Sequence, residues 1–243
     1  MALTGLDIYK LLPRTNCKKC GRPTCLAFAM QLAQKKASID ECPDVSEQAK
    51  QTLGAASAPP IKLVTIGAGT NALQVGEENV LFRHEEKFYH PAGVAVAVSD
   101  RLSEAELDKK LKEVSALRFH RVGTEIGINL VAVQNDSGDK DAFARASQKV
   151  SSNTNLLLIL ASQSPEAMAQ ALSVDGLAAK RPLLYGANNQ NFESMAKLAK
   201  EKNCPLGVHS TSLEELADLT EKIKALGVSE MVLNYQGNGV RDV

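Results

Sequence analysis

Four cysteines occur within the first fifty residues in the pattern Cys17-x2-Cys20-x4-Cys25-x16-Cys42, and only Cys204 occurs in the rest of the chain. Thiolates at such short spacing favour iron-sulfur clusters or zinc. The first three cysteines, on one loop, can occupy three corners of a cubane, and the fourth can arrive after an intervening helix. A proline follows the last cysteine, as in many cluster-binding loops. We therefore expect all four to bind one metal centre.

Zinc is the alternative metal for these thiols. A zinc knuckle needs a histidine and a closely following cysteine, and a zinc ribbon pairs two Cys-x2-Cys halves, whereas this chain has one such half. The spacing therefore favours iron-sulfur. Gly21 permits tight passage of the backbone near the sulfurs. The nearby basic residues are Arg14, Lys18, Lys19 and Arg22. They could supply positive charge near an anionic cluster, and a solvated basic surface explains them equally well.

Composition limits the class of protein. The chain has 243 residues, 44% of them hydrophobic, which is enough to fill an ordinary core. Its formal net charge is zero, which argues against nucleic-acid binding. No apolar run approaches the ~20 residues of a membrane span, and the N-terminus has no signal-peptide pattern. We expect a cytoplasmic protein, in whose reducing surroundings clustered cysteines are metal ligands and not disulfides.

The elements that must position the cysteines form a small helical module, residues 1–53. The sequence predicts a helix that starts at Thr4, a helix over 24–36 with Thr24 as its N-cap, and a short helix over 45–53. So short a segment has few residues for a core. We therefore expect the metal centre to contribute much of the module's folding free energy.

A segment of small residues and proline, 54–60, is predicted to be a linker. In the second domain, 61–243, short aliphatic runs alternate with amphipathic stretches. The strand candidates are 61–66, 92–98, 128–134, 156–161, 183–185, 206–209 and 231–234. The helix candidates are 103–117, 139–151, 164–172, 192–202 and 213–226. The segment 71–89 has no helical period and is predicted to be an extended pair.

Near-continuous apolar strands separated by helices predict an α/β domain whose parallel strands are covered on both faces. Five strand–helix units and a sixth strand follow from near Gly93. A closed eight-stranded barrel needs about 250 residues, and residues 61–243 are fewer. The alternatives are an open doubly wound sheet and an incomplete TIM-type barrel.

The segment LPRTNCKKCGRPTCLAFAMQLAQKKASIDECPDVSEQAK resembles the N-terminal 4Fe-4S module of the large (gamma) subunit of the corrinoid iron-sulfur protein of the CO dehydrogenase/acetyl-CoA synthase system. The resemblance extends through SAPPIKLVTIGAG, VLFRHEEKFYHPAGVAVAVSD, RPLLYGANN and NCPLGVHS, and so covers essentially the whole chain. It implies that Cys17, Cys20, Cys25 and Cys42 bind a 4Fe-4S cluster. It also implies a TIM-barrel-like middle domain. The family's subunit continues with the rest of that barrel and a C-terminal corrinoid-binding domain, so we expect a partial barrel here.

The function implied by this resemblance is that of a methyl carrier. In the family, electrons pass from the cluster to a corrinoid and return Co(II) to Co(I), and a methyl group then passes from a methylated pterin to acetyl-CoA synthase. The implied partners are a smaller barrel subunit in a heterodimer, a pterin methyltransferase, and CO dehydrogenase/acetyl-CoA synthase. The chain would be a carrier subunit and not a self-sufficient catalyst. Corrinoid is expected in the full assembly and not in this chain alone.

Two other functions remain open from the sequence. The same cysteine spacing resembles the cluster module of membrane-associated electron-transport complexes, which would make the chain a stand-alone 4Fe-4S electron relay. A zinc-stabilised binding module on an α/β domain is the third and least favoured hypothesis.

Weaker motifs each have a simpler structural explanation. The glycines of 67–72 superficially fit a dinucleotide turn, but no helical pattern follows, so we expect no nucleotide there. The segment with His84, Glu85, Glu86 and His90 could bind metal and is better explained as an exposed hairpin.

Polar residues at the predicted strand ends are expected to be helix N-caps and not ligand contacts; they are Asp100, Asn135, Asp136, His209, Ser210 and Asn234. Cys204, just before a strand, is expected to be a small buried hydrophobe.

Overall fold

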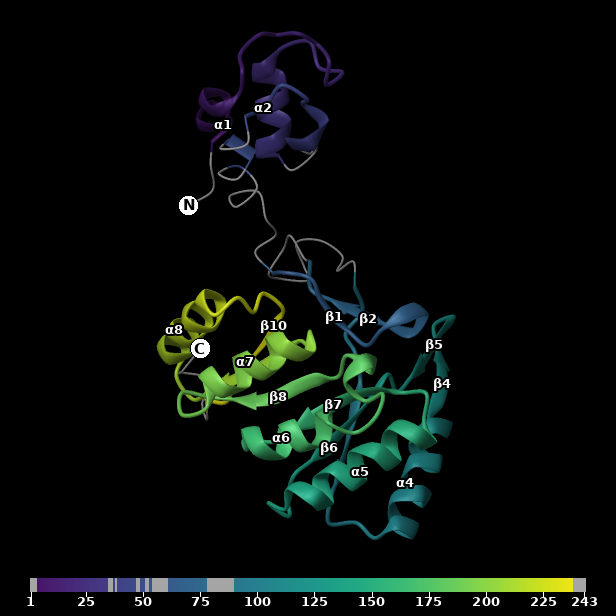
Figure 1. Cartoon of the computed structure of the whole chain (residues 1–243). Helices are drawn as coiled ribbons and strands as arrows, with labels where there is room; N and C mark the ends of the chain where they lie inside the picture. The colour runs from purple at the N-terminus through teal and green to yellow at the C-terminus, as the bar shows by residue number, and fades with distance from the viewer. Residues whose placement is uncertain are drawn as a thin grey trace. The chain divides into compact units, whose positions relative to one another are not determined.

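The computed structural model describes residues 4–34, 37, 39–46, 49–50, 53, 61–77 and 90–237. The chain divides into two compact units, Met1–Pro60 and Ile61–Val243 (Figure 1). Within the described ranges, no helix combines the length and the apolar character needed to cross a membrane.

The first unit contains α1 (Gly5–Leu11) and α2 (Cys25–Ala33). Both predicted helix starts are confirmed, because Thr4 and Thr24 are the N-caps and each side-chain oxygen accepts a backbone hydrogen bond from the third residue after it. A short 3-10 helix, η1 (Ile39–Glu41), precedes the last cysteine. α2 ends earlier than predicted; residues 35–36 and much of the predicted helix 45–53 lie outside the described residues.

A small apolar core joins these helices. Gly5 lies where α1 crosses α2, and a Cβ atom there would be 2.4 Å from Sδ of Met30, so glycine permits the close approach. The buried residues of this cluster are Ile8, Leu12, Cys25, Phe28, Ala29, Leu32, Cys42, Val45, Ala49 and Leu53. Two of the four expected ligands therefore belong to the core itself.

The second unit is built on six parallel strands: β3 (Ala95–Ser99), β6 (Leu130–Gln134), β7 (Leu157–Ala161), β8 (Leu183–Ala187), β9 (Leu206–Ser210) and β10 (Met231–Tyr235). The helices that follow the first five are α4 (Glu104–Ala116), α5 (Lys140–Asn153), α6 (Pro165–Leu172), α7 (Phe192–Lys202) and α8 (Leu213–Ala225). Five strand–helix units and a sixth strand are thus confirmed.

The winding of this sheet is that of a TIM-type barrel. Its strand order, β10-β9-β8-β7-β6-β3, follows the sequence without reversal (Figure 1). Because crossovers between parallel strands are right-handed, an unreversed order places every helix on the same face, whereas a doubly wound sheet reverses and uses both. The helices therefore cover one face of the strands, and the order of these six strands is not that of an open doubly wound sheet. Within the described residues the sheet does not close: β3 and β10 each pair on one side alone.

The opposite face is covered near the amino ends of the strands by an antiparallel hairpin, β1 (Val64–Ile66) and β2 (Leu73–Val75). Val64 and Ile66 are buried against Leu130 and Leu183 of the sheet. The predicted strand 61–66 is thus shorter than expected and lies outside the parallel sheet. Of the predicted extended pair 71–89, residues 78–89 lie outside the described residues.

A second hairpin, β4 (Arg118–Arg121) and β5 (Thr124–Gly127), interrupts the connection from α4 to β6. Its turn places Val122 and Gly123 at φ 49° and 76°, the left-handed pair of a two-residue hairpin loop. This hairpin was not predicted from the sequence.

Candidate metal centre

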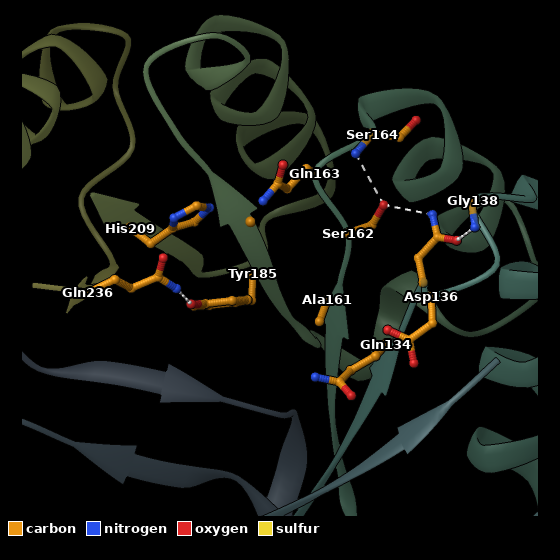
Figure 2. A pocket seen from close by; sticks show the side chains of 12 residues that line it. Gln134, Asp136, Gly138, Ala161, Ser162, Gln163, Ser164, Tyr185, His209 and Gln236 are labelled. Atoms are coloured by element: carbon orange, nitrogen blue, oxygen red, sulfur yellow. Dashed lines mark hydrogen bonds between the residues drawn. The ribbon is translucent and has the colours of Figure 1, made fainter. Parts of the chain in front are cut away.

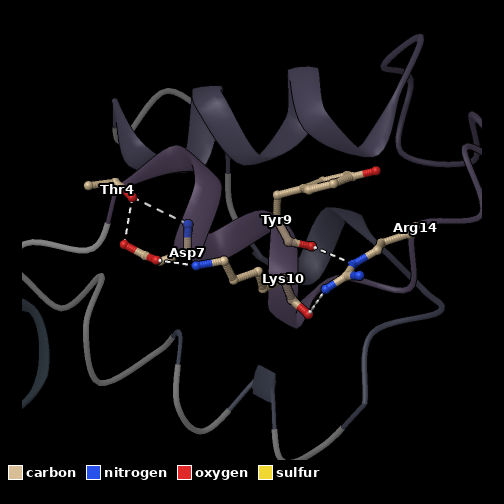
Figure 3. A network of polar contacts seen from close by, with 5 residues as sticks. All are labelled: Thr4, Asp7, Tyr9, Lys10 and Arg14. Carbon is tan, nitrogen blue, oxygen red and sulfur yellow. Dashed lines mark hydrogen bonds and ion pairs between the residues drawn. The ribbon is translucent and has the colours of Figure 1, made fainter.

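Arg14 fixes the start of the loop that carries the first three cysteines. Its Nη2 donates a hydrogen bond to the Lys10 carbonyl at 2.9 Å and its Nε donates to the Tyr9 carbonyl at 3.4 Å, while the guanidinium lies 5.5 Å from the centre of the Tyr9 ring (Figure 3). These bonds satisfy carbonyl groups at the C-terminus of α1. Arg14 therefore acts on the backbone of α1, a role the sequence analysis did not anticipate.

The loop itself turns through four left-handed residues, Arg14 (φ 58°), Asn16 (φ 49°), Lys18 (φ 62°) and Gly21 (φ 75°). The Gly21 N–H donates to the Lys18 carbonyl at 2.9 Å and closes a tight turn around Cys20. Gly21 is the one glycine of the four, and it sits where tight passage of the backbone was expected from the sequence. The loop thus brings Cys17 and Cys20 onto one short turn.

Cys25 is held by reciprocal hydrogen bonds with Asn16. The Cys25 N–H donates to Asn16 Oδ1 at 2.8 Å, and the Asn16 N–H donates to Cys25 Sγ at 3.4 Å. Cys25 is also the first residue of α2, where the helix dipole favours negative charge. Asn16 was not predicted from the sequence, although an Asx residue beside a cysteine in a loop often forms such local hydrogen bonds.

Cys42 lies in the core and close to the other three thiols. Its side chain is 4% exposed. Burial raises the pKa of the Cys42 thiol, and the negative charges of Cys20, Cys17 and Cys25 raise it further. Cys20 packs against the same core, and Cys17 is exposed. Although α2 separates Cys42 from the other three cysteines in the sequence, the fold brings all four close enough to interact electrostatically. We call this group of four thiols one electrostatic neighbourhood.

The donor set suits a thiolate-bound centre, but the thiols are not in ligating geometry. Within the described residues, no group of three or more His, Cys, Asp or Glu side chains is placed to hold a metal ion. Four thiolates at short range repel one another, and the raised pKa of Cys42 reflects part of that cost. A cationic centre relieves this repulsion and displaces the thiol protons.

Lys19 is the basic residue most directly tied to this neighbourhood. Its Nζ lies 3.0 Å from both carboxylate oxygens of Asp44. The hydrogen bond from Lys19 lowers the pKa of Asp44, with a smaller contribution from a hydrogen bond with Cys17. The hydrogen bond to Asp44 likewise raises the pKa of Lys19. The charge of Lys19 is thus committed to a partner inside the module.

A separate pocket of about 400 Å³ opens at the carboxyl ends of the sheet strands. The Tyr185 hydroxyl oxygen accepts hydrogen bonds from Asn234 Nδ2 at 2.6 Å and from Gln236 Nε2 at 3.1 Å, and the Tyr185 ring stacks on His209 with centroids 5.8 Å apart. Figure 2 shows these rings on one side of the pocket and Asp136 on the other. The lining residues are Gln134, Asn135, Asp136, Gly138, Ala161, Ser162, Gln163, Ser164, Tyr185, Gly186, His209 and Gln236.

Five of the strand-end residues precede a described helix and are not its N-cap as predicted: Asp100, Asn135, Asp136, His209 and Ser210. For Asn234 the prediction falls on a segment outside the described residues. The caps are Ser103, Asp139, Ser164, Asn191 and Ser212, which lie further along each loop. Asp100 instead accepts hydrogen bonds from the N–H and the hydroxyl of Ser137, at 2.9 and 2.6 Å. Asn135 donates to the Ser162 hydroxyl at 2.9 Å. The prediction was wrong because the strand ends tie neighbouring loops together before each helix begins. Tyr185 and Gln236, which the sequence analysis did not single out, also line this pocket.

The structure describes part of the weaker motifs, and the exposed hairpin predicted around His84 and His90 stays a prediction. Cys204 is buried, and burial raises the pKa of its thiol to about 11. The glycines of 67–72 are followed by a 3-10 turn and β2, not by the helix of a dinucleotide site. His90 Nδ1 lies 2.7 Å from the Gly76 carbonyl oxygen. The other members of that motif, residues 84–86, lie outside the described residues.

Two family models match the chain. The model described as "CO dehydrogenase/acetyl-CoA synthase delta subunit" matches residues 63–240, and the model described as "Putative Fe-S cluster" matches residues 12–43. The second match contains all four clustered cysteines, and the first covers well over half of the chain.

Curated relatives agree with these matches. The chain is 49% identical to the corrinoid/iron-sulfur protein large subunit of Moorella thermoacetica, over 96% of the chain and 52% of the relative. It is 37% identical to the acetyl-CoA decarbonylase/synthase complex subunit gamma of Methanothermobacter thermautotrophicus, over 100% of the chain and 53% of that protein. The corresponding subunit of Methanopyrus kandleri is 38% identical over 89% of the chain and 46% of its own length. The chain spans about half the length of these relatives.

Proposed function

Because the chain belongs to the family described as the CO dehydrogenase/acetyl-CoA synthase delta subunit, we propose that it is the iron-sulfur part of a corrinoid methyl carrier. In this proposal Cys17, Cys20, Cys25 and Cys42 bind a 4Fe-4S cluster. When bound, such a cluster supplies single electrons that return the cobalt of a corrinoid from Co(II) to Co(I) for methyl transfer from a methylated pterin to acetyl-CoA synthase. The corrinoid belongs to the full assembly.

One observation carries the proposal: four thiols spread over 26 residues of sequence share one electrostatic neighbourhood, within the segment that matches an iron-sulfur model. Thiolate-only ligation at a Cys-x2-Cys-x4-Cys spacing favours an iron-sulfur cluster over zinc. The relatives named as corrinoid/iron-sulfur and acetyl-CoA decarbonylase/synthase subunits add the context of a methyl carrier.

The four cysteines have different surroundings, and these suit electron exchange. Cys25 and Cys42 are buried, which excludes water from one side of the site. Cys17 is exposed, so the opposite side faces the surface, where a redox partner can approach. Electron transfer needs the partner to come close to the cluster, and the burial of Cys25 and Cys42 keeps water from the inner side of the site.

The proposed partners are a smaller barrel subunit, a pterin methyltransferase, and CO dehydrogenase/acetyl-CoA synthase, with all components in the cytoplasm. Residues 1–53 would form the cluster-binding module, residues 54–60 a linker, and residues 61–243 the partial barrel. Two units with separate cores suit a reductant that must approach a corrinoid and then withdraw for methyl transfer.

The decisive experiment is anaerobic purification with metal and sulfide analysis. We expect a brown protein with about four iron and four sulfide per chain, as a four-thiolate cubane requires. A colourless preparation containing zinc would reject the iron-sulfur function. Co-purification with a smaller barrel subunit and a red corrinoid separates the methyl carrier from a stand-alone electron relay, which would purify brown and free of cobalt.

Cysteine variants assign the ligands. Cys42→Ala should lose or convert the cluster while residues 61–243 stay folded, because their core is separate. Cys204→Ala is the matched control, since it removes a buried thiol of the other unit. Equal iron content in wild type and Cys42→Ala would exclude Cys42 as a ligand.

A further inference from the structure

Two ion pairs bracket the second and fourth cysteines. Lys19 and Arg22 flank Cys20 closely in sequence, and Glu41 and Asp44 flank Cys42 in the same way. Lys19 Nζ lies 3.0 Å from Asp44 Oδ1, and Arg22 Nη2 lies 3.3 Å from Glu41 Oε2. The two ion pairs thus join residues on either side of Cys20 in the sequence to residues on either side of Cys42.

From this arrangement we infer that Lys19–Asp44 and Arg22–Glu41 are positioning pairs that hold Cys42 against the Cys17–Cys25 loop for cluster binding. The inference rests on the proposed iron-sulfur function and goes beyond it, because it assigns a role in the site to four residues that are not ligands.

The need for such pairs follows from how differently the ligands are held. Cys25 has reciprocal hydrogen bonds to Asn16 and the start of α2. Cys42 follows η1 and is separated from Cys25 by sixteen residues. Its backbone N–H donates to the Ile39 carbonyl at 3.2 Å, which is a bond inside its own segment. Packing in the apolar core and contacts that cross from this segment to the ligand loop therefore set the position of Cys42 together.

Arg22 is suited to this task because it contacts two elements at once. Its Nε donates a hydrogen bond to Gln31 Oε1 on α2, while its Nη2 contacts Glu41 at the end of η1. Its planar guanidinium fixes the direction of both bonds, which a lysine could not do. Arg22 thus relates the loop, the helix and the Cys42 segment to one another.

The pairs are partly exposed: the side chains of Lys19 and Asp44 are 58% and 34% exposed. Partly exposed pairs contribute little singly to stability, so an effect on folding alone should be small. An effect on where Cys42 sits is different in kind, because ligation tolerates little displacement of a sulfur. The inference therefore predicts a change in cluster retention without a comparable change in the folding of the apo module.

The test uses the full chain reconstituted anaerobically with iron and sulfide. The variants are Glu41→Gln, Asp44→Asn and the double variant, which keep side-chain shape and remove the charges. The release of iron to a chelator is measured over time, together with the EPR spectrum of each sample. We expect roughly tenfold faster release from the double variant than from wild type, the size two such pairs give together. We also expect a 3Fe-4S signal, which marks loss of a single ligand.

Matched controls separate positioning from general destabilisation. Lys19→Gln should accelerate iron release, whereas Lys10→Gln should not, although it breaks an exposed lysine–aspartate pair of the same 3.0 Å length on α1 of the same unit (Figure 3). The charge-reversed double variant Lys19→Asp/Asp44→Lys should recover retention. Circular dichroism of the apo proteins should be the same for all variants.

Several results would overturn the inference. Retention in Glu41→Gln/Asp44→Asn equal to that of wild type would do so, as would equal acceleration by Lys10→Gln and Lys19→Gln, or a charge reversal that fails to restore retention. If wild type itself assembles no cluster, the proposed function fails and the positioning role fails with it. If wild type and the variants retain their clusters equally well, only the positioning role is refuted.

Discussion

Truncation of Phe28 tests whether the cysteine-bearing unit depends on its own small core. Phe28 lies on α2 three residues after Cys25 and is 1% exposed. Replacing it with alanine removes the whole ring from the core and costs about 3–5 kcal/mol. A unit of this size seldom gains more than about 3–5 kcal/mol from its core. We therefore expect apo Phe28→Ala to be largely unfolded over residues 4–53.

Amide hydrogen exchange read by mass spectrometry is the suitable assay, because it reports each segment of the chain separately. In apo Phe28→Ala, peptides from residues 4–53 should lose their protection, while peptides from 90–237 should exchange as in wild type. Leu219→Ala is the reciprocal control. Leu219 is fully buried on α8 of the second unit, and its truncation should cost about 2–5 kcal/mol there and leave the first unit unchanged.

Two results would refute this reasoning. Full protection of residues 4–53 in Phe28→Ala would mean that the small core does not hold the apo unit together. Loss of protection across both units in either variant would mean that the two cores are coupled. Cluster binding should partly restore protection in Phe28→Ala, because a ligand that binds only the folded state stabilises it.

Three further predictions concern the second unit. Gly186 has φ 131°, and a Cβ atom there would lie 2.2 Å from a backbone carbonyl oxygen, so Gly186→Ala should lower the free energy of unfolding by at least ~1–3 kcal/mol in thermal melts. Gly176 has φ 76° and open space around it, so Gly176→Ala should lower the free energy of unfolding less, and a larger loss at Gly176 would contradict the argument. Burial raises the pKa of the Cys204 thiol to about 11, so Cys204 should resist iodoacetamide at about pH 8 in the folded apo protein. Labelling of Cys204 as fast as that of the exposed Cys17, measured by mass spectrometry, would disprove this prediction. The hydrogen bond from Lys149 lowers the pKa of Asp108 below its usual 3.8. The ionised Asp108 therefore stabilises the fold above that pH, and this contribution is lost as the pH falls through the folded pKa. Between about pH 5 and pH 2, the free energy of urea unfolding should fall less steeply for Asp108→Asn than for wild type, and parallel curves would argue against the pair.

Much of the second unit could be predicted because its elements have strong local patterns. Aliphatic runs such as 156–161 and 206–209 lie in the observed strands or extend them by one residue, and the helices between them begin within one residue of the predicted starts. Buried parallel strands leave this signal because almost every side chain in them is apolar. The β4–β5 hairpin left none that was recognised, since its turn has Val122 where an asparagine or aspartate would usually announce the left-handed conformation.

The candidate ligands of the site could be predicted from the sequence, but the residues that form hydrogen bonds and ion pairs around them could not. Cysteine spacing identified Cys17, Cys20, Cys25 and Cys42, and as ligands they remain a prediction. Asn16, which exchanges hydrogen bonds with Cys25, had no comparable signal. Neither did the pairing of Lys19 with Asp44, because those residues lie twenty-five positions apart in the sequence. Side-chain partners across that distance depend on how α2 and η1 fold back, which local pattern does not encode.

The sequence by itself determined which residues could act as ligands, where the strands of the parallel sheet and the helices between them occur, and that they alternate, because each depends on residue type and on periods of a few residues. Only the tertiary structure decided that the strands follow one another without reversal, so that the helices share one face and the sheet has TIM-type winding. It also decided that Cys42 is buried beside three thiols and that Arg14 serves the end of α1. These outcomes depend on packing between segments distant in sequence, where the free energy belongs to the contact and not to either segment alone.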